Sequence, residues 1–181
     1  MIKLKLPLNE KELLNLKCGD EVLLTGVIYT ARDAAHKRLI EEINAGKEPP
    51  FKLENSVIYY VGPAPAKPGQ AIGSAGPTSS YRMDPYAIYL FEKNAKISIG
   101  KGDRSQDFKD KLNEHQGLYL SAIGGAAALI SRSIKKCDLV AYPELGAEAI
   151  YRLEVEDFPA VVTYDAHGGD LFQSGRLLYR K

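Results

Sequence analysis

The chain has 181 residues, of which 45% are hydrophobic and 26% charged, values typical of one globular domain with a substantial core. Its net charge of +1 provides no general attraction for nucleic acid or for an anionic membrane, so neither is expected as a partner. No stretch is apolar for long enough to span a bilayer, and lysines and acids interrupt the apolar pattern of residues 1–16, which predicts a cytoplasmic protein.

Strands and helices are predicted to alternate along most of the chain. Alternating or continuous apolar and β-branched residues predict strands at residues 2–6, 21–30, 56–61, 96–99, 118–123 and 139–141. Apolar residues at helical spacing predict helices at residues 34–45, 85–93, 105–115 and 126–135. Their N-caps are expected at Asp33, at Asp84 and at either Asp103 or Ser105.

The C-terminal part departs from this alternation. Its pattern predicts two strands at residues 150–155 and 160–164 that form an antiparallel pair, followed by a tail from Leu171. The whole order predicts a single mixed α/β domain over residues 1–181, with a central sheet and helices on its flanks.

The stretch AIGSAGPTSSYRMD, residues 71–84, has the composition of a ligand-binding loop. Its glycines and proline exclude a regular element, and four hydroxyl residues at 78–81 precede Arg82. Hydroxyls and a guanidinium where a loop enters a helix suit a small carboxylate or phosphate. The alternative is a glycine- and serine-rich surface loop.

Three predicted strand-to-helix junctions each carry one cation, at Arg32, Arg82 and Lys101. Such junctions gather at one edge of the sheet in open α/β folds. If the three converge, two guanidiniums and one ammonium surround one cavity, and a dicarboxylate fits because each carboxylate can accept a bidentate arginine. The alternative is three separate, solvated surface charges.

The reactive groups near these cations are the hydroxyls of Thr78 and Ser79. A hydroxyl is a poor base unless nearby positive charge stabilises its deprotonated form. The sequence shows no serine–histidine–aspartate set, no cysteine beside a histidine and no clear acidic pair. The residues alone therefore predict an anion-binding domain whose catalytic set is incomplete.

The cysteines and histidines predict no metal ligands in this chain. Cys18 and Cys137 belong to no CxxC motif, and His36, His115 and His167 are scattered without zinc-like spacing. Cys137 is expected to be a packed thiol at the start of a buried strand. An iron–sulfur cluster normally needs several thiolates, which this chain cannot supply alone.

Several motifs resemble one enzyme family. They are TARDAAHKRL at 30–39, GPTSSYRMD at 76–84, IGKGDRS at 99–105, AIGGAAALI at 122–130 and YPELGAEAIYRLEVEDFPA at 142–160. Together they are similar to the β subunit of the iron–sulfur hydro-lyases, the class I fumarate hydratases and L-tartrate dehydratases, and to the C-terminal domain of the single-chain members. The resemblance implies a swivelling β/β/α domain.

The favoured activity that the resemblance implies is the reversible hydration of fumarate to (S)-malate. The alternatives are the β subunit of an L-tartrate dehydratase, a non-catalytic carboxylate-binding module, and an accessory subunit with a purely structural role.

Residue roles also follow from the resemblance. Thr78 corresponds to the proposed base that removes the C3 proton, and Ser79, Arg82 and Arg32 correspond to residues that contact the substrate carboxylates. Lys101 completes the cationic pocket as a further substrate-binding residue and favours deprotonation of Thr78.

The resemblance places the cofactor on another chain. A [4Fe–4S] cluster is expected on three cysteines of an α subunit, and neither cysteine of this chain matches them. The implied partners are that α subunit, in an α2β2-type assembly, and a C4 dicarboxylate substrate.

Overall fold

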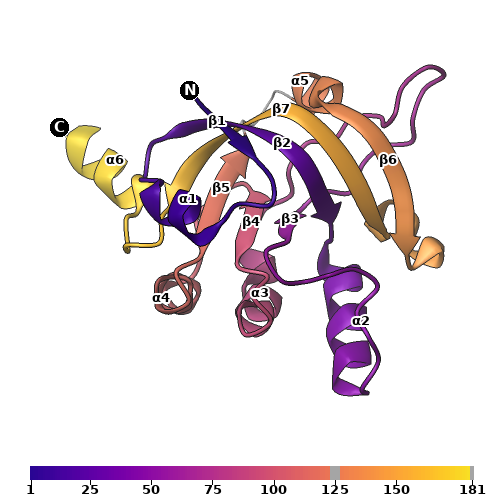
Figure 1. Cartoon of the computed structure of the whole chain (residues 1–181), viewed down its shortest axis with the longest axis horizontal. Helices are drawn as coiled ribbons and strands as arrows, with labels where there is room; N and C mark the ends of the chain where they lie inside the picture. Colours follow the sequence, from indigo (N-terminus) through magenta and orange to yellow (C-terminus); the bar gives the residue numbers. More distant parts are fainter. Residues whose placement is uncertain (123–126, 180–181) are drawn as a thin grey trace.

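The computed structural model describes residues 1–122 and 127–179, without the side chains of residues 128, 178 and 179. Within these ranges, seven strands form a mixed sheet in the order β1-β2-β3-β4-β5-β7-β6, with helices on its flanks (Figure 1). The helices and strands, with two 3₁₀ turns named η, are β1 Ile2–Lys5, α1 Glu10–Asn15, β2 Glu21–Thr30, α2 Asp33–Asn44, β3 Val57–Tyr59, η1 Tyr81–Met83, α3 Asp84–Phe91, β4 Ile97–Gly100, α4 Gln106–Glu114, β5 Leu118–Ala122, α5 Ala127–Ser133, β6 Ile134–Ala141, η2 Pro143–Glu148, β7 Ile150–Tyr164 and α6 Leu171–Tyr179. None of the helices in these ranges is long and apolar enough to cross a membrane.

The long strand β7 closes part of the sheet into a ring. Strands β1 to β5 run parallel, whereas β7 runs antiparallel to β2, β5 and β6. Because β7 pairs with both β2 and β5, the strands β2, β3, β4, β5 and β7 form a closed circuit. Tyr59 on β3 and Phe158 on β7 meet edge to face across this circuit, with ring centroids 5.3 Å apart, so the interior is a packed core.

Helices α2, α3 and α4 lie next to one another outside the ring (Figure 1). Each presents an apolar stripe to the sheet; in α4 the buried residues are Phe108 and Leu112, at helical spacing. Each helix follows a parallel strand, so each begins at the edge where the parallel strands end. The register places the last residues of β2, β3 and β4, which are Thr30, Tyr59 and Gly100, at that edge, called here the carboxyl edge.

The predicted mixed α/β sheet with flanking helices is confirmed, and so is the irregular loop after β3. Residues 62–80 contain neither helix nor named strand, and their first part forms an arm that extends outward (Figure 1). The two limbs of the arm are joined by hydrogen bonds from the Ala64 amide to the Ser74 carbonyl, 2.9 Å, and from the Gly73 amide to the Ala64 carbonyl, 3.1 Å.

Two predicted helix caps are wrong. Asp33 and Asp84 are the first residues of α2 and α3, and the residues before them, Arg32 and Met83, make no side-chain cap hydrogen bond. Both aspartates pair with arginines instead, as described below. Ser105, one of the two predicted caps of α4, does cap it, because its hydroxyl accepts a hydrogen bond from the amide three residues later at 3.2 Å.

The predicted pair of strands at the C-terminal end is also wrong. Residues 150–164 form the single strand β7, because residues 156 and 157 make a bulge opposite Thr25 rather than a turn. Asp157 has φ +50°, its amide donates to Thr25 Oγ1 at 3.1 Å, and Pro159 stays in register with Leu23 on β2. The chain from Leu171 is the helix α6 rather than a tail.

The boundary between the predicted helix at 126–135 and the predicted buried strand at 139–141 lies at a different residue in the structure. The helix ends at Ser133 and the strand begins at Ile134, whereas residue 126, the predicted start, lies outside the described ranges. Because β6 pairs with β7 on one side only, it is an outer strand with partly exposed side chains rather than a buried one. Cys137 is half-buried and packs against the core.

Gly26 provides a test of the crowding between β1 and β2. It has φ +141°, and a Cβ there would lie 2.7 Å from Leu6 Cβ. We expect Gly26→Ala to lower the free energy of unfolding by about 2–4 kcal/mol, because it adds backbone strain to an overpacked contact. Urea denaturation followed by circular dichroism measures this loss.

The matched control is Gly46→Ala, because Gly46 has φ +81° but no atom within 4 Å of an added Cβ. Only the backbone strain remains there, about 1 kcal/mol. Equal losses in the two variants would contradict the role given to Leu6.

Candidate functional site at the carboxyl edge

Arg32 lies where the chain passes from β2 into α2. Its Nε is 3.4 Å from Glu148 Oε1 but makes no hydrogen bond there or to any other residue of the described part of the chain. A Cβ on Gly62 would lie 2.8 Å from Arg32 Nη1, so the guanidinium lies against the chain that leaves β3. Glycine at position 62 makes room for it.

Arg82 lies on the 3₁₀ turn before α3 and faces the start of α2. Its Nη2 is 3.3 Å from Asp33 Oδ2, in a pair whose side chains are both more than a third exposed. The contact therefore contributes little stability. It nevertheless brings the segment after β3 against the residue next to Arg32.

Lys101 follows β4 directly and lies against the same segment. Ser79 and Lys101 form an isolated parallel bridge, the Ser80 amide donates to the Lys101 carbonyl at 3.0 Å, and the Lys101 amide donates to Ser80 Oγ at 2.9 Å. Gly100 permits this approach, because a Cβ there would overlap Ser80 Oγ. The Lys101 side chain is exposed, and no ion pair is found for it among residues 1–122 and 127–179.

The structure thus brings the five predicted site residues to one edge of the sheet. Asp33 connects Arg82 to the junction of Arg32, and the bridge to Lys101 holds Ser79. Thr78 is half-buried, and its amide donates to the Tyr60 carbonyl at 2.8 Å, which places it at the end of β3. Their roles toward a ligand stay predictions.

A buried ion pair that the sequence did not indicate lies beneath this edge. Arg104 Nε donates to Asp84 Oδ1 at 2.5 Å, and the two side chains are 0% and 6% exposed. The other oxygen of Asp84 accepts a hydrogen bond from the Ser105 amide at 2.7 Å. Burial acts to lower the pKa of Arg104, but Tyr60 and the Asp84 carboxylate outweigh it and raise the pKa above its usual value.

His36 is a second buried polar group at this edge. Its Nδ1 donates to the Arg32 carbonyl at 2.8 Å, and its ring stacks on Tyr86 with centroids 5.6 Å apart. Burial lowers the pKa of His36 to about 4, because the charged ring would lose its hydration. The histidine is therefore neutral near pH 7, which suits a structural role under the cations better than proton transfer.

The two cysteines do not fit an iron–sulfur cluster. Burial and the Asp165 charge raise the pKa of Cys18 to about 12, and burial also raises the pKa of Cys137, so both remain thiols. Cys18 Sγ donates to the Thr163 carbonyl at 3.2 Å, whereas Cys137 lies opposite Leu153. Leu153 and Thr163 are ten residues apart on β7, which corresponds to roughly 30 Å along an extended strand, so the two thiols lie near distant parts of β7. In the described ranges, no group of three or more histidines, cysteines or acids could hold a metal ion.

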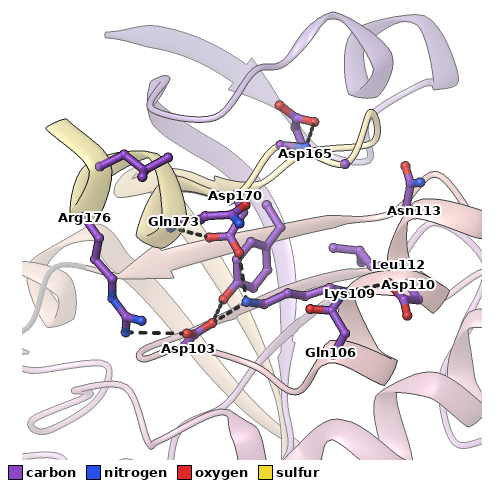
Figure 2. Close-up of a pocket in the computed structure, with 14 residues that line it drawn as sticks. Asp103, Gln106, Lys109, Asp110, Leu112, Asn113, Asp165, Asp170, Gln173 and Arg176 are labelled. Atoms are coloured by element: carbon purple, nitrogen blue, oxygen red, sulfur yellow. Dashed lines mark hydrogen bonds and ion pairs between the residues drawn. The ribbon is translucent and has the colours of Figure 1, made fainter.

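A cavity of about 1000 Å³ lies elsewhere, between α4 and α6 (Figure 2). On its wall Lys109 Nζ is 2.8 Å from both Asp103 Oδ1 and Asp170 Oδ2, and Arg176 reaches Asp103 at 3.9 Å. None of the five predicted site residues lines it. We place the candidate site at the carboxyl edge because Arg82 and Lys101 are exposed there, whereas Lys109 is less exposed and is already paired with two carboxylates.

Comparison with known proteins identifies the family. The family model described as Fumarase C-terminus matches residues 1–175. The chain belongs to this family. The match over residues 1–175 confirms the family resemblance that the sequence motifs predict.

Members of the fumarase C-terminus family that are similar to this chain carry two kinds of name. "Fumarate hydratase class I, anaerobic" of Escherichia coli is 49% identical over 83% of this chain, and "Fumarate hydratase 2" of Leishmania major is 40% identical over 94% of it. The "Putative L(+)-tartrate dehydratase subunit beta" of Methanocaldococcus jannaschii is 38% identical over 96% of it.

The matched shares of these relatives differ sharply. This chain spans only 28% and 31% of the two fumarate hydratases but 93% of the tartrate dehydratase subunit. The fumarase C-terminus domain is therefore one part of the longer relatives and nearly all of the shorter one.

The neutral state of His36 predicts a pH-dependent loss of stability. Its pKa lies near 6.5 in the unfolded chain and about 4 in the folded one, so between these values only the unfolded chain binds the proton. The free energy of unfolding should therefore fall as the pH drops from 6.5 to 4, with a contribution of about 3 kcal/mol from His36. Urea denaturation at half-unit pH steps measures the profile.

The variant His36→Phe keeps a ring against Tyr86 and should remove this part of the slope. Lys37→Gln, which removes an exposed charge next in sequence, should keep it. A His36→Phe profile parallel to that of the unmodified chain would contradict the interpretation.

Proposed function

We propose that this domain supplies the dicarboxylate-binding residues and the proton acceptor of an iron–sulfur hydro-lyase that interconverts fumarate and (S)-malate. The observation that carries the proposal is that Arg32, Arg82 and Lys101 lie at the same edge of the sheet as the hydroxyl residues Thr78 and Ser79. The names of the fumarate hydratase relatives support the reaction.

The cations suit a substrate with two carboxylates. Arg32 and Arg82 each have one carboxylate partner, at 3.4 and 3.3 Å, and neither pair is deeply buried. Such pairs are weak, so a substrate carboxylate that offers two oxygens in a fork can replace them. Lys101 supplies a further positive charge at the same edge.

Thr78 is the proposed proton acceptor. The backbone of Lys101 is bridged to Ser79, the residue that follows Thr78. A positive charge that approaches the Thr78 hydroxyl favours its deprotonated form. In the direction from malate to fumarate, Thr78 Oγ1 takes the proton from C3, the electrons of that C–H bond form the double bond, and hydroxide leaves from C2. A [4Fe–4S] cluster on the partner would supply the Lewis acid that stabilises this hydroxide. In the direction of hydration, hydroxide adds to C2 and Thr78 returns the proton to C3.

We propose that the [4Fe–4S] cluster and its cysteine ligands belong to a partner α subunit, in an α2β2-type assembly. Two observations support a partner: the cysteines of this chain do not fit the cluster, and the tartrate dehydratase relative is named as a subunit and is matched over 93% of its length.

That relative also favours tartrate as the second candidate substrate. L-Tartrate is likewise a C4 dicarboxylate, and its dehydration removes water across the same carbon–carbon bond. The cationic residues at the carboxyl edge suit both substrates, so activity assays with fumarate and with tartrate must distinguish them.

The direct test mixes the chain anaerobically with its cluster-bearing partner and measures fumarate hydration and tartrate dehydration. We expect Thr78→Ala to lower kcat by about 10²–10⁴-fold, because a positioned acid–base group contributes that much. Thr78→Ser keeps the hydroxyl and should retain most of the rate. Arg82→Gln should raise the KM for the dicarboxylate, because a guanidinium contact is lost.

Arg38→Gln is the control, because Arg38 on α2 pairs with Glu42 and Glu144 instead of facing the proposed site. It should leave both constants unchanged. Full activity of the Thr78→Ala complex would refute the assignment of the base, and binding of a dicarboxylate without any turnover would favour a non-catalytic module.

A further inference from the structure

Hydrogen bonds fasten the segment 78–84, which carries Arg82, to the turn 100–105, which carries Lys101, at two points. The first fastening is the pair of hydrogen bonds between Ser80 and Lys101, at 3.0 and 2.9 Å. Tyr119 supports it, because its hydroxyl lies 3.0 Å from Ser80 Oγ and 2.9 Å from the Gly102 carbonyl. Arg82 follows this point by two residues.

The second fastening is Asp84, two residues beyond Arg82. One carboxylate oxygen accepts from Arg104 Nε at 2.5 Å, and the other accepts from the Ser105 amide at 2.7 Å. Arg82 therefore lies between two points at which its segment is attached to the turn that bears Lys101. A shift at either point would move one cation relative to the other.

The Arg104 side chain is enclosed on the side away from Asp84. Its Cζ lies 3.5 Å from the centroid of the Phe108 ring and 4.8 Å from that of Tyr119, and Nη2 lies 3.5 Å from the Tyr60 hydroxyl. With 0% of the side chain exposed, it cannot reach a ligand at the surface. A fully buried cation needs a paired carboxylate, which here is Asp84.

The geometry points to Arg104 as a positioning residue, which with Asp84 sets the placement of Arg82 relative to Lys101 for dicarboxylate binding. This inference rests on the proposed function for its kinetic readout. Its structural readout is independent of that function, because the amides of Lys101 and Ser105 donate the hydrogen bonds at the two fastenings.

The experiment compares Arg104→Met, Arg104→Lys and the double variant Asp84→Asn/Arg104→Met in the full chain. Arg104→Met should speed hydrogen exchange at the amides of Lys101 and Ser105 by tenfold or more, an order-of-magnitude expectation for a lost local clamp. With the partner present, kcat/KM should fall on the order of a hundredfold, because misplaced binding groups cost about that much.

The other two variants separate positioning from folding. Arg104→Lys keeps a charge near Asp84 but loses the planar fork and the ring contacts, so it should rescue part of both readouts. The double variant leaves no unpaired buried charge, so it should fold well and still be as impaired in kcat/KM as Arg104→Met. Arg176→Met, which removes an exposed arginine from α6, is the control and should change nothing.

Each other outcome overturns the inference. Unchanged exchange at both amides in Arg104→Met would show that the pair does not hold the segments, whatever the kinetics. Faster exchange with unchanged kcat/KM would show that the clamp does not position the cations. If the unmodified complex lacks hydro-lyase activity, the proposed function fails, and the exchange data still decide whether Arg104 holds the two segments together.

Discussion

Strand β7 pairs with both β2 and β5, and this double pairing determines how the other strands are arranged. It closes five strands into a ring and fills the interior with apolar side chains such as Tyr59 and Phe158. The register of the parallel strands sets which strand ends lie side by side. The junctions after β2, β3 and β4 therefore lie at one edge, and so do the three cations that these separate segments carry.

Polar groups at the carboxyl edge lie in two layers, which differ in how far their ion pairs are exposed to solvent. The outer layer contains Arg82 and Asp33, a partly exposed pair that is worth little and is easily exchanged for a ligand. The inner layer contains Asp84 and Arg104, which are buried and cannot separate without leaving a charge unpaired. This division suits a binding site, because the groups that would meet a ligand are adaptable and the groups beneath them are fixed.

Local patterns predicted that Arg32 and Lys101 lie where strands end, because each follows an apolar strand and precedes a helix or a glycine. Thr78 lies far beyond the end of β3 in sequence, and only the hydrogen bond from its amide to the Tyr60 carbonyl places it there. The pair of Asp84 and Arg104 could not be predicted, because it joins residues 20 positions apart through packing. The same limit explains the wrong caps: Asp84 looks like an N-cap in sequence, but its carboxylate is engaged by a distant arginine. Asp157 and Pro159 are typical of a turn and therefore predict two strands, whereas in the structure Asp157 lies in a bulge and Pro159 pairs in register with β2.

We propose that the carboxyl edge, rather than the cavity between α4 and α6, binds a C4 dicarboxylate. Titration of the ¹⁵N-labelled chain with malate distinguishes the two places, because each backbone amide reports its own surroundings. We expect the largest chemical-shift changes at Arg32, Ser79, Arg82 and Lys101. Changes confined to Lys109, Tyr164 and Arg176, or no change at the carboxyl edge at saturating malate, would contradict it.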